Sequence, residues 1–130
     1  MKVIHKAGKR KTAIARATMK AGKGVVRINY NTLETYEPEM ARLKITEPLV
    51  IAGAISSKYD ISINVKGGGW QSQAEAARLA IARCFMEADG KLKIKFLEYD
   101  RNLVVADTRR KEAYKPGDSK ARKKRQKSFR

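Results

Sequence analysis

The sequence contains very little of the two residue types that build disulfides and zinc sites. Cys84 is the only cysteine and His5 the only histidine among 130 residues. A single cysteine cannot close an internal disulfide, which is typical of proteins in a reducing cytosol. One cysteine and one histidine are also too few for a Cys/His zinc cage. We therefore expect a cytoplasmic protein that uses no metal and no other cofactor.

Long apolar runs are absent as well. No stretch approaches the roughly 18 apolar residues that a transmembrane helix needs. The basic start, MKVIHKAGKRKTAIARATMK, is not followed by an apolar segment, so we expect no secretory signal. Aromatic residues make up only 7 % of the chain, which argues against a stacking platform for single-stranded nucleic acid.

Acidic residues are scarce too, and their distribution is uneven. The chain has 30 Lys and Arg against 13 Asp and Glu, a net charge of +17 that is typical of a partner of polyanions, either nucleic acid or an anionic membrane surface. Residues 1–30 hold nine basic and no acidic residues, and residues 109–130 hold eleven basic and two acidic ones. Residues 31–108 are nearly balanced, with ten basic and eleven acidic residues. The middle thus resembles a globular surface, and both ends resemble polyanion-binding segments.

Residues 107–130 are predicted to form a separate, extended tail behind a globular core of residues 1–106. Within residues 109–130 only Ala113, Tyr114, Ala121 and Phe129 are apolar, so this segment has almost nothing to bury. Like charges should extend it, to about 70 Å at most for 22 residues at about 3.3 Å each. The alternative is a charge run that is merely solvated.

Apolar periodicity predicts strands alternating with helices. Residues 11–20 alternate between small apolar and larger residues and are expected to form a strand that packs on a helix. The glycine-containing turn at 21–24 and residues 25–29 then predict a hairpin with that strand. Further predictions are a helical turn at 31–36, short helices starting at Pro38 and Pro48, a strand at 60–66, and a long helix from Trp70 that Gly90 ends. Residues 91–100 fit either a strand alternation or a helical stripe. Together these elements favour an α+β or α/β layer structure.

Two motifs point to phosphate binding. Gly67-Gly68-Gly69 follows a predicted strand, precedes a helix and lies beside Lys66, so its backbone amides could approach a phosphate or could simply form a tight turn. Lys9, Arg10 and Lys11 precede a strand, and a flexible basic arm there could contact a phosphate backbone. Enzyme chemistry is poorly supported, because His5 lies in the basic start with no acid nearby in sequence and Cys84 lies on the apolar stripe of the long helix.

Three segments resemble the family of small-subunit ribosomal protein number nine, in its archaeal and eukaryotic form. They are GKRKTAIAR at 8–16, GGGWQSQ at 67–73 with its small-residue helix, and the basic run from Asp107 to Arg130. Their order and spacing agree over essentially the whole chain. The resemblance implies an α/β sandwich of about four strands with helices on one side, like the second domain of ribosomal protein number five. It also implies that residues 91–100 form a helix.

The resemblance further implies a structural, non-enzymatic constituent of the small ribosomal subunit. Its expected partners are small-subunit rRNA in the head, neighbouring head proteins and the tRNA in the peptidyl site. The residues expected to bind rRNA are Lys9, Arg10, Lys11, Arg16, Lys66, Gly67, Gly68, Arg109, Arg110, Lys111, Lys115, Lys120, Arg122, Lys123, Lys124 and Arg125. Those expected near the tRNA are Lys127, Ser128 and Arg130. Phe129 stands where bacterial members carry Lys, and Cys84 where a smaller residue is expected.

Two other classes explain part of the sequence. A DNA-compacting basic protein accounts for the charge but not for a neutral core with a glycine triplet. An RNA-modifying enzyme accounts for RNA affinity but needs a base or a nucleophile, and only His5 and Cys84 are available.

Overall fold

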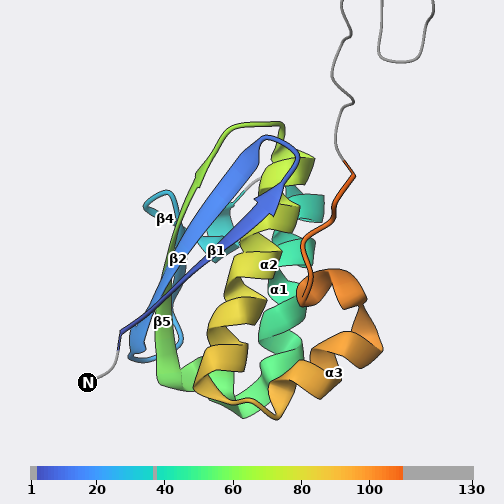
Figure 1. Ribbon diagram of the computed structural model, residues 1–130. Helices are drawn as coiled ribbons and strands as arrows, with labels where there is room; N and C mark the ends of the chain where they lie inside the picture. Colours follow the sequence, from blue (N-terminus) through green and yellow to red (C-terminus); the bar gives the residue numbers. More distant parts are fainter. Residues whose placement is uncertain (1–2, 37, 110–130) are drawn as a thin grey trace, which may run out of the picture.

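One face of a five-stranded sheet is covered by helices, and the other face is open (Figure 1). The computed structural model describes residues 3–36 and 38–109. The strands are β1 (Ile4–Arg10), β2 (Ala13–Ala21), β3 (Val26–Ile28), β4 (Asn31–Thr32) and β5 (Tyr59–Lys66). The helices are α1 (Glu39–Ala52), α2 (Trp70–Ala88) and α3 (Leu92–Tyr99), joined by short 3-10 turns at Leu33–Thr35, Gly53–Lys58 and Arg101–Leu103. This confirms the predicted α/β sandwich with helices on one side, with one more strand than the expected four.

The strand order is β1-β2-β5-β3-β4, with only the β3–β5 pair parallel. The predicted hairpin between residues 11–20 and 25–29 is therefore wrong, because β5 lies between β2 and β3. The loop from β2 is held on β5 instead: Gly22 N donates to Lys58 O at 2.9 Å, and Ile61 N donates to Val25 O at 2.9 Å. The partner of β2 on its other side is β1, which pairs with it over seven residues from Ile4↔Met19 to Arg10↔Ala13. The basic start is thus an edge strand of the sheet, and the flexible arm expected there is wrong for residues 4–10.

Helix α1 runs without a break through Pro48, which corrects the two short helices expected on either side of it. A proline in a helix interior removes one hydrogen bond and crowds the preceding turn. Here Ala41, Ile45, Pro48 and Ala52 are all buried and recur at helical spacing, so one continuous apolar stripe faces the core. Burial of that stripe outweighs the local cost of the proline.

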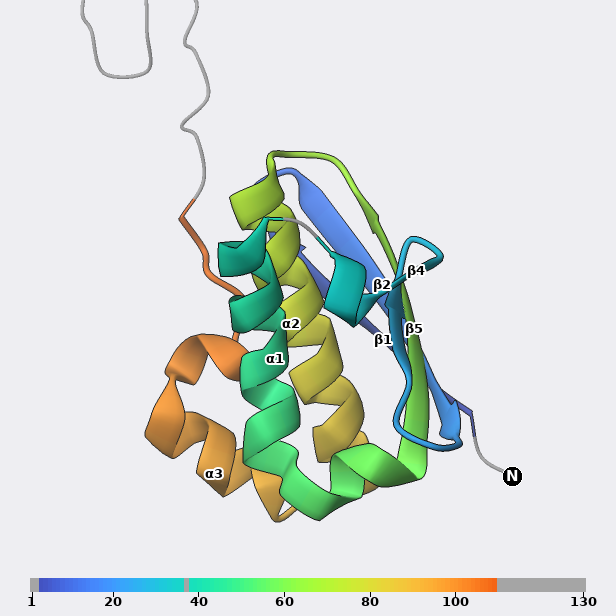
Figure 2. The same cartoon turned by 180° about the vertical axis from the view of Figure 1, so that it is seen from behind.

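Helix α2 is buried on two sides, between the sheet and α1 (Figure 2). Small residues let it approach the sheet closely: Ala13, Ala15 and Ala17 of β2 are at most 1 % exposed. At Gly8 of β1 the approach is closest, since a Cβ atom there would lie 2.1 Å from the Ala76 carbonyl oxygen. The strand face that packs on α2 therefore tolerates no larger residue at position 8.

The remaining predictions for local structure hold with small shifts. The strand expected at 60–66 is β5, the turn at 31–36 contains the 3-10 turn Leu33–Thr35, and residues 91–100 form α3 rather than a strand. Leu92 and Phe96 of α3 are buried, one helical turn apart, which decides between the two periodicities. No helix among the described residues is long and apolar enough to cross a membrane.

Candidate nucleic-acid interface

The open face of the sheet, meaning the surface that no helix covers, is basic and polar. Alternation along the strands directs His5, Ala7, Lys9, Ile14, Arg16, Thr18, Lys20, Arg27, Asp60, Ser62, Asn64 and Lys66 toward it. This set contains five Lys or Arg, one acidic residue and no aromatic residue. A basic, non-aromatic surface can contact a phosphate backbone but offers no platform for base stacking.

The strand register groups three of these cations. Lys9 of β1 is opposite Ile14 of β2, and Ile14 is opposite Lys66 of β5. Arg16 lies two residues farther along β2 on the same face. With about 4.8 Å between strands and about 3.4 Å per residue, Arg16 and Lys66 are about 8 Å apart at their Cα atoms. Lys9, Arg16 and Lys66, all predicted from sequence, thus form one triangle on the open face.

The single acid of this face, Asp60, is occupied by backbone. Its Oδ1 accepts hydrogen bonds from the N–H groups of Lys23, Gly24 and Val25 at 2.9–3.1 Å. The hydrogen bond from Val25, followed by that from Lys23, holds the pKa of Asp60 below its usual value. Its negative charge therefore fixes the loop after β2, and the open face keeps a clear excess of positive charge.

Two turns that are far apart in sequence meet at one end of the sheet. We define the turn end as residues 9–12, around the β1–β2 turn, together with residues 66–69, between β5 and α2. A Cβ atom on Gly67 would lie 2.5 Å from the Thr12 carbonyl oxygen, and one on Gly68 would lie 3.2 Å from the Cβ of Ala13. Gly67 and Gly68 have φ of +81° and +66°, so both the close approach and the backbone conformation require glycine. The glycine triplet thus has a structural reason for its composition, whatever it binds.

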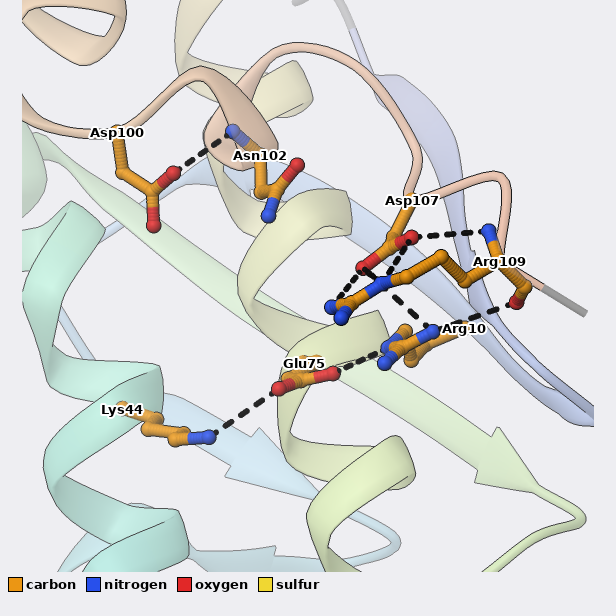
Figure 3. Close-up of polar contacts among 7 residues, drawn as sticks. All are labelled: Arg10, Lys44, Glu75, Asp100, Asn102, Asp107 and Arg109. Carbon is orange, nitrogen blue, oxygen red and sulfur yellow. Dashed lines mark hydrogen bonds and ion pairs between the residues drawn. The ribbon is translucent and has the colours of Figure 1, made fainter.

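Arg10 also belongs to the turn end, but its side chain points to the helices (Figure 3). Its side chain is 11 % exposed, and its Nε lies 2.6 Å from Glu75 Oε2 of α2. Its Nη1 lies 3.5 Å from Asp107 Oδ2 and donates to the backbone oxygen of Arg109 at 3.4 Å. Glu75 also binds Lys44 of α1 at 3.2 Å. Arg10 therefore joins β1, α2 and the chain after the last 3-10 turn.

The first residues of the predicted tail are thereby attached to the core. Asp107, whose side chain is 12 % exposed, accepts hydrogen bonds from the backbone N–H of Arg109 at 2.9 Å and from its Nη2 at 2.6 Å. The Arg109 side chain, then its backbone N–H, lowers the pKa of Asp107 well below its usual range. The described chain thus ends beside the turn end at Arg109, where two other predicted segments, Lys9–Lys11 and Lys66–Gly68, also meet.

Arg78 holds the helix layer together in the same way. Its Nε lies 2.8 Å from Glu47 Oε2 of α1, and its Nη2 lies 2.9 Å from Asp100 Oδ2. Glu75 and Arg78 lie three residues apart on α2, a spacing at which opposite charges can pair. Each binds residues of other elements, because both point into the space of about 240 Å³ between α1, α2 and the chain at 100–109.

Sequence reasoning located some of the basic residues and missed others. Lys9, Arg16 and Lys66 lie on the open face, Lys11, Gly67 and Gly68 lie at the turn end, and Arg109 lies beside it. Arg10 differs, because its guanidinium is engaged inside the protein. Lys20 and Arg27 were missed although they share the open face, and period-two alternation in residues 13–21 and 26–28 could have found them. Arg110, Lys111, Lys115, Lys120, Arg122, Lys123, Lys124, Arg125, Lys127, Ser128 and Arg130 lie outside the described residues.

Residues with catalytic potential have structural roles in this fold. Burial raises the pKa of the Cys84 thiol to about 11, so it is not a thiolate at neutral pH. His5 Nδ1 lies 3.1 Å from Thr18 Oγ1 on the open face, with no carboxylate paired to it among the described residues. Within residues 3–36 and 38–109, no group of three or more His, Cys, Asp or Glu side chains could hold a metal ion.

Comparison with known proteins decides the family. The sequence model of the family described as "Ribosomal protein S9/S16" matches residues 8–130. The chain belongs to this family. Its relatives include the "Small ribosomal subunit protein uS9" of Methanococcus maripaludis strain C7, which is 52 % identical, and that of Methanococcus vannielii, which is 48 % identical. Both matches cover 100 % of each chain.

Membership of the S9/S16 family confirms the central prediction from sequence. The chain is a structural, non-enzymatic protein of the small ribosomal subunit, and so a component of the cytoplasmic ribosome. It is neither a DNA-compacting protein nor an RNA-modifying enzyme. Two features remain expectations at this point: the RNA contacts of individual residues, and the reach of the tail to tRNA.

Proposed function

We propose that the chain binds small-subunit rRNA through the turn end together with the basic tail, and that the tail extends to the tRNA of the peptidyl site. The observation that carries the rRNA proposal is the convergence of three basic segments at one end of the sheet. Lys9–Lys11, Lys66–Gly68 and Arg109 are each separated by about 40 residues or more along the chain, yet they lie side by side. A surface assembled from separate basic segments is the electrostatic footprint of a nucleic-acid partner.

The contacts that we propose are mostly to phosphates. Lysine and arginine on a phosphate backbone give affinity and register, without base identity. The turn end supplies Lys9, Lys11 and Lys66, with backbone amides of Gly67 and Gly68. Arg16 adds a cation from the adjoining open face, and the tail supplies the basic residues from Arg109 to Arg125. About ten phosphate contacts correspond to a slope near −9 for the logarithm of affinity against the logarithm of salt concentration.

Arg10 has a different role in this proposal. Its guanidinium is bound by Glu75 and Asp107, and contact with a polyanion would require those ion pairs to break. We assign Arg10 to holding the start of the tail on the core. On this basis the globular unit includes Asp107 and Arg109 in addition to the core of residues 1–106.

Lys127, Ser128 and Arg130 are proposed to approach the tRNA in the peptidyl site. A cation and a hydroxyl at the end of a basic chain can donate hydrogen bonds to phosphates without any chemical step. Phe129 cannot neutralise a phosphate, so its contribution would be stacking. Neighbouring proteins of the subunit head are the remaining partners of the proposal.

Deletion of residues 127–130 tests the division between core and tail. We expect the truncated chain to enter small subunits as efficiently as the intact chain does. We expect the subunits that contain it to bind peptidyl-site tRNA more weakly. Sucrose-gradient sedimentation at low and high salt measures incorporation, and filter binding of tRNA to the purified subunits measures tRNA affinity.

The matched control is K123Q/K124Q, which removes two tail charges, as the deletion does, but leaves the last four residues in place. It should retain tRNA binding if position, and not total charge, decides the effect. Failure of the truncated chain to enter subunits would contradict the proposed division of roles. Sedimentation of the intact chain away from the small subunit would contradict the rRNA proposal itself.

A further inference from the structure

We infer that the open face beyond the turn end, around Lys20 and Arg27, is a second RNA-binding surface that holds the backbone of a helical RNA segment. This inference rests on the proposed function, because it adds a surface to the same rRNA partner. Lys20 and Arg27 belong to the basic start of the chain, but neither is adjacent to another basic residue, and both are far in sequence from the glycine triplet. Only the sheet brings them onto one face with Lys9, Arg16 and Lys66.

The register gives the layout of this surface. Thr18 of β2 is opposite Ser62 of β5, and Ser62 is opposite Arg27 of β3. Lys20 lies two residues beyond Thr18 on the same side of β2. From the row of Lys9 and Lys66 to Lys20 there are six residues, or about 20 Å along the strands. A duplex carries about one charge per 1.7 Å of axis, so this length meets about a dozen phosphates.

The cations of this face are available for an external partner. Lys9, Arg16, Lys20 and Lys66 make no ion pair or side-chain hydrogen bond with another residue of the described chain. Arg27 has only the longer-range attraction of Asp60, whose Oδ1 is already bound by three backbone N–H groups. Unpaired cations on a rigid sheet are held at fixed spacing, which favours a rigid polyanion.

The polar residues between the cations support the same ligand. A hollow of about 400 Å³ is lined by Thr18, Lys20, Val25, Arg27, Asp60, Ile61 and Ser62. Its hydroxyl groups and cations are donors that phosphate and ribose oxygens accept from. Its one carboxylate, that of Asp60, already accepts three backbone hydrogen bonds at Oδ1. The hollow lies between the two missed cations and is therefore where we expect a phosphate group to sit.

The composition of the face selects RNA backbone over other macromolecules. Cores of protein–protein interfaces are depleted of lysine and enriched in aromatic residues, whereas this face has five cations and no aromatic side chain. Single-stranded RNA is held by aromatic stacking, which this face cannot supply. Double-helical RNA is recognised by shape and by contacts to phosphate and 2′-hydroxyl, which it can supply.

The test is a charge-matched comparison in the full chain. K20Q/R27Q removes two charges from the open face, and K93Q/K95Q removes two exposed charges from α3 in the helix layer. Binding to an RNA hairpin of about 16 base pairs is measured as a function of salt. We expect K20Q/R27Q to weaken binding about tenfold and to reduce the salt slope by about 1.8, and K93Q/K95Q to change both much less.

A second variant, S62E, guards against a trivial loss of folding. It adds a negative charge at the hollow without removing any cation, and circular dichroism should show an unchanged melting temperature for both face variants. We expect S62E to weaken RNA binding as well. Equal losses of RNA affinity in K20Q/R27Q and K93Q/K95Q would overturn the inference, because the total charge of the chain would then explain both losses. Unchanged RNA binding in the face variants, together with failure to enter subunits, would also overturn it and indicate a protein neighbour.

These outcomes are distinct from failure of the proposed function. If the proposed function fails, the intact chain itself does not bind rRNA through the turn end and tail. If only the present inference fails, the intact chain binds and the open-face variants behave like the α3 control.

Discussion

The two faces of the sheet carry the same types of cationic side chain, lysine and arginine, but in different surroundings. On the side of the helices, Lys6, Arg10, Lys44 and Arg78 form ion pairs with Glu87, Glu75, Asp107, Glu47 and Asp100. Arg42 and Arg83 donate instead to the backbone oxygens of Glu34 and Ala7. On the open face the cations have almost no acid beside them. Residue type alone therefore does not identify an RNA contact in this protein.

The charge totals of the two regions explain the difference. Helices α1, α2 and α3 carry six basic and five acidic residues, so this layer is nearly neutral. Lys44 and Arg78 pair with carboxylates there. The open face carries five basic residues and one acid that the backbone already binds. A nearly neutral layer stabilises the fold, and a strongly positive face attracts a polyanion. Substitutions in the two regions should therefore have different effects, on stability in one and on RNA binding in the other.

The largest effect is expected where the sheet meets α2. Gly8→Ala places a Cβ atom against the Ala76 carbonyl oxygen and should destabilise the fold by about 3 kcal/mol, because backbone atoms must shift. Chemical denaturation measures the free energy of unfolding. Ala7→Ser, one residue away on the open face, is the control and should change it by less than about 0.5 kcal/mol. Equal stability of the two variants would show that α2 does not pack on β1 as described.

A smaller effect is expected from replacing, one at a time, Arg10 of β1 and Arg16 of β2. Arg10→Gln leaves Glu75 and Asp107 without their shared cation and should lower the melting temperature by roughly 5 °C. Arg16→Gln should leave the melting temperature unchanged and reduce the salt slope of RNA binding by about 0.9. Thermal melts and salt titrations on both variants measure the two effects. If Arg10→Gln changed only RNA binding and Arg16→Gln lowered only the melting temperature, Arg16 would be the structural arginine and Arg10 the RNA contact.

The smallest effect is expected in the pH dependence of stability. Burial raises the pKa of Glu75, but hydrogen bonds and charge from Arg10 and Lys44 outweigh it, so the net pKa is below the ordinary value of 4.5. A lowered pKa in the fold gives stability that is present above about pH 4.5 and is lost as the pH falls through the folded value. Because Glu75 and Lys44 are partly exposed to solvent, the contribution of this carboxylate to the free energy of unfolding is less than about 1 kcal/mol. The stability difference between the intact chain and E75Q should therefore shrink from pH 6 to pH 3, and a constant difference would contradict the role of this carboxylate.

Local sequence predicted those elements whose pattern agrees with their tertiary environment. The strands β2 and β5 have clean period-two alternation, and α2 has two apolar stripes, so all three follow from sequence. Pro48 indicated a helix start but lies inside α1, because the buried stripe from Ala41 to Ala52 stabilises the longer helix. The glycine turn at 21–24 indicated a hairpin, but the contacts that hold it come from Lys58 and Asp60. These misjudgements have one cause, since each local signal was outweighed by a contact far away in sequence.

The basic residues of the candidate interface likewise differ in how well the sequence predicted them. Contiguous clusters such as Lys9–Lys11 stand out in sequence, whereas Lys20 and Arg27 are isolated and become neighbours only through the pairing of β2, β5 and β3. Arg10 illustrates the converse, because one step along a strand turns a side chain to the other face. Its place beside Lys9 and Lys11 indicated RNA binding, and its inward orientation gives it Glu75 and Asp107 instead.

The amino-acid sequence was enough to indicate the class of partner, a nearly neutral middle segment between two basic ends, and the family. Those properties depend on composition and on short motifs, which no fold can alter. Only the tertiary structure decided the strand order, the unbroken helix through Pro48, and which cations are paired and which face outward. Those properties depend on contacts between residues distant in sequence, and a carboxylate neutralises a cation only where the fold brings the two within a few ångströms.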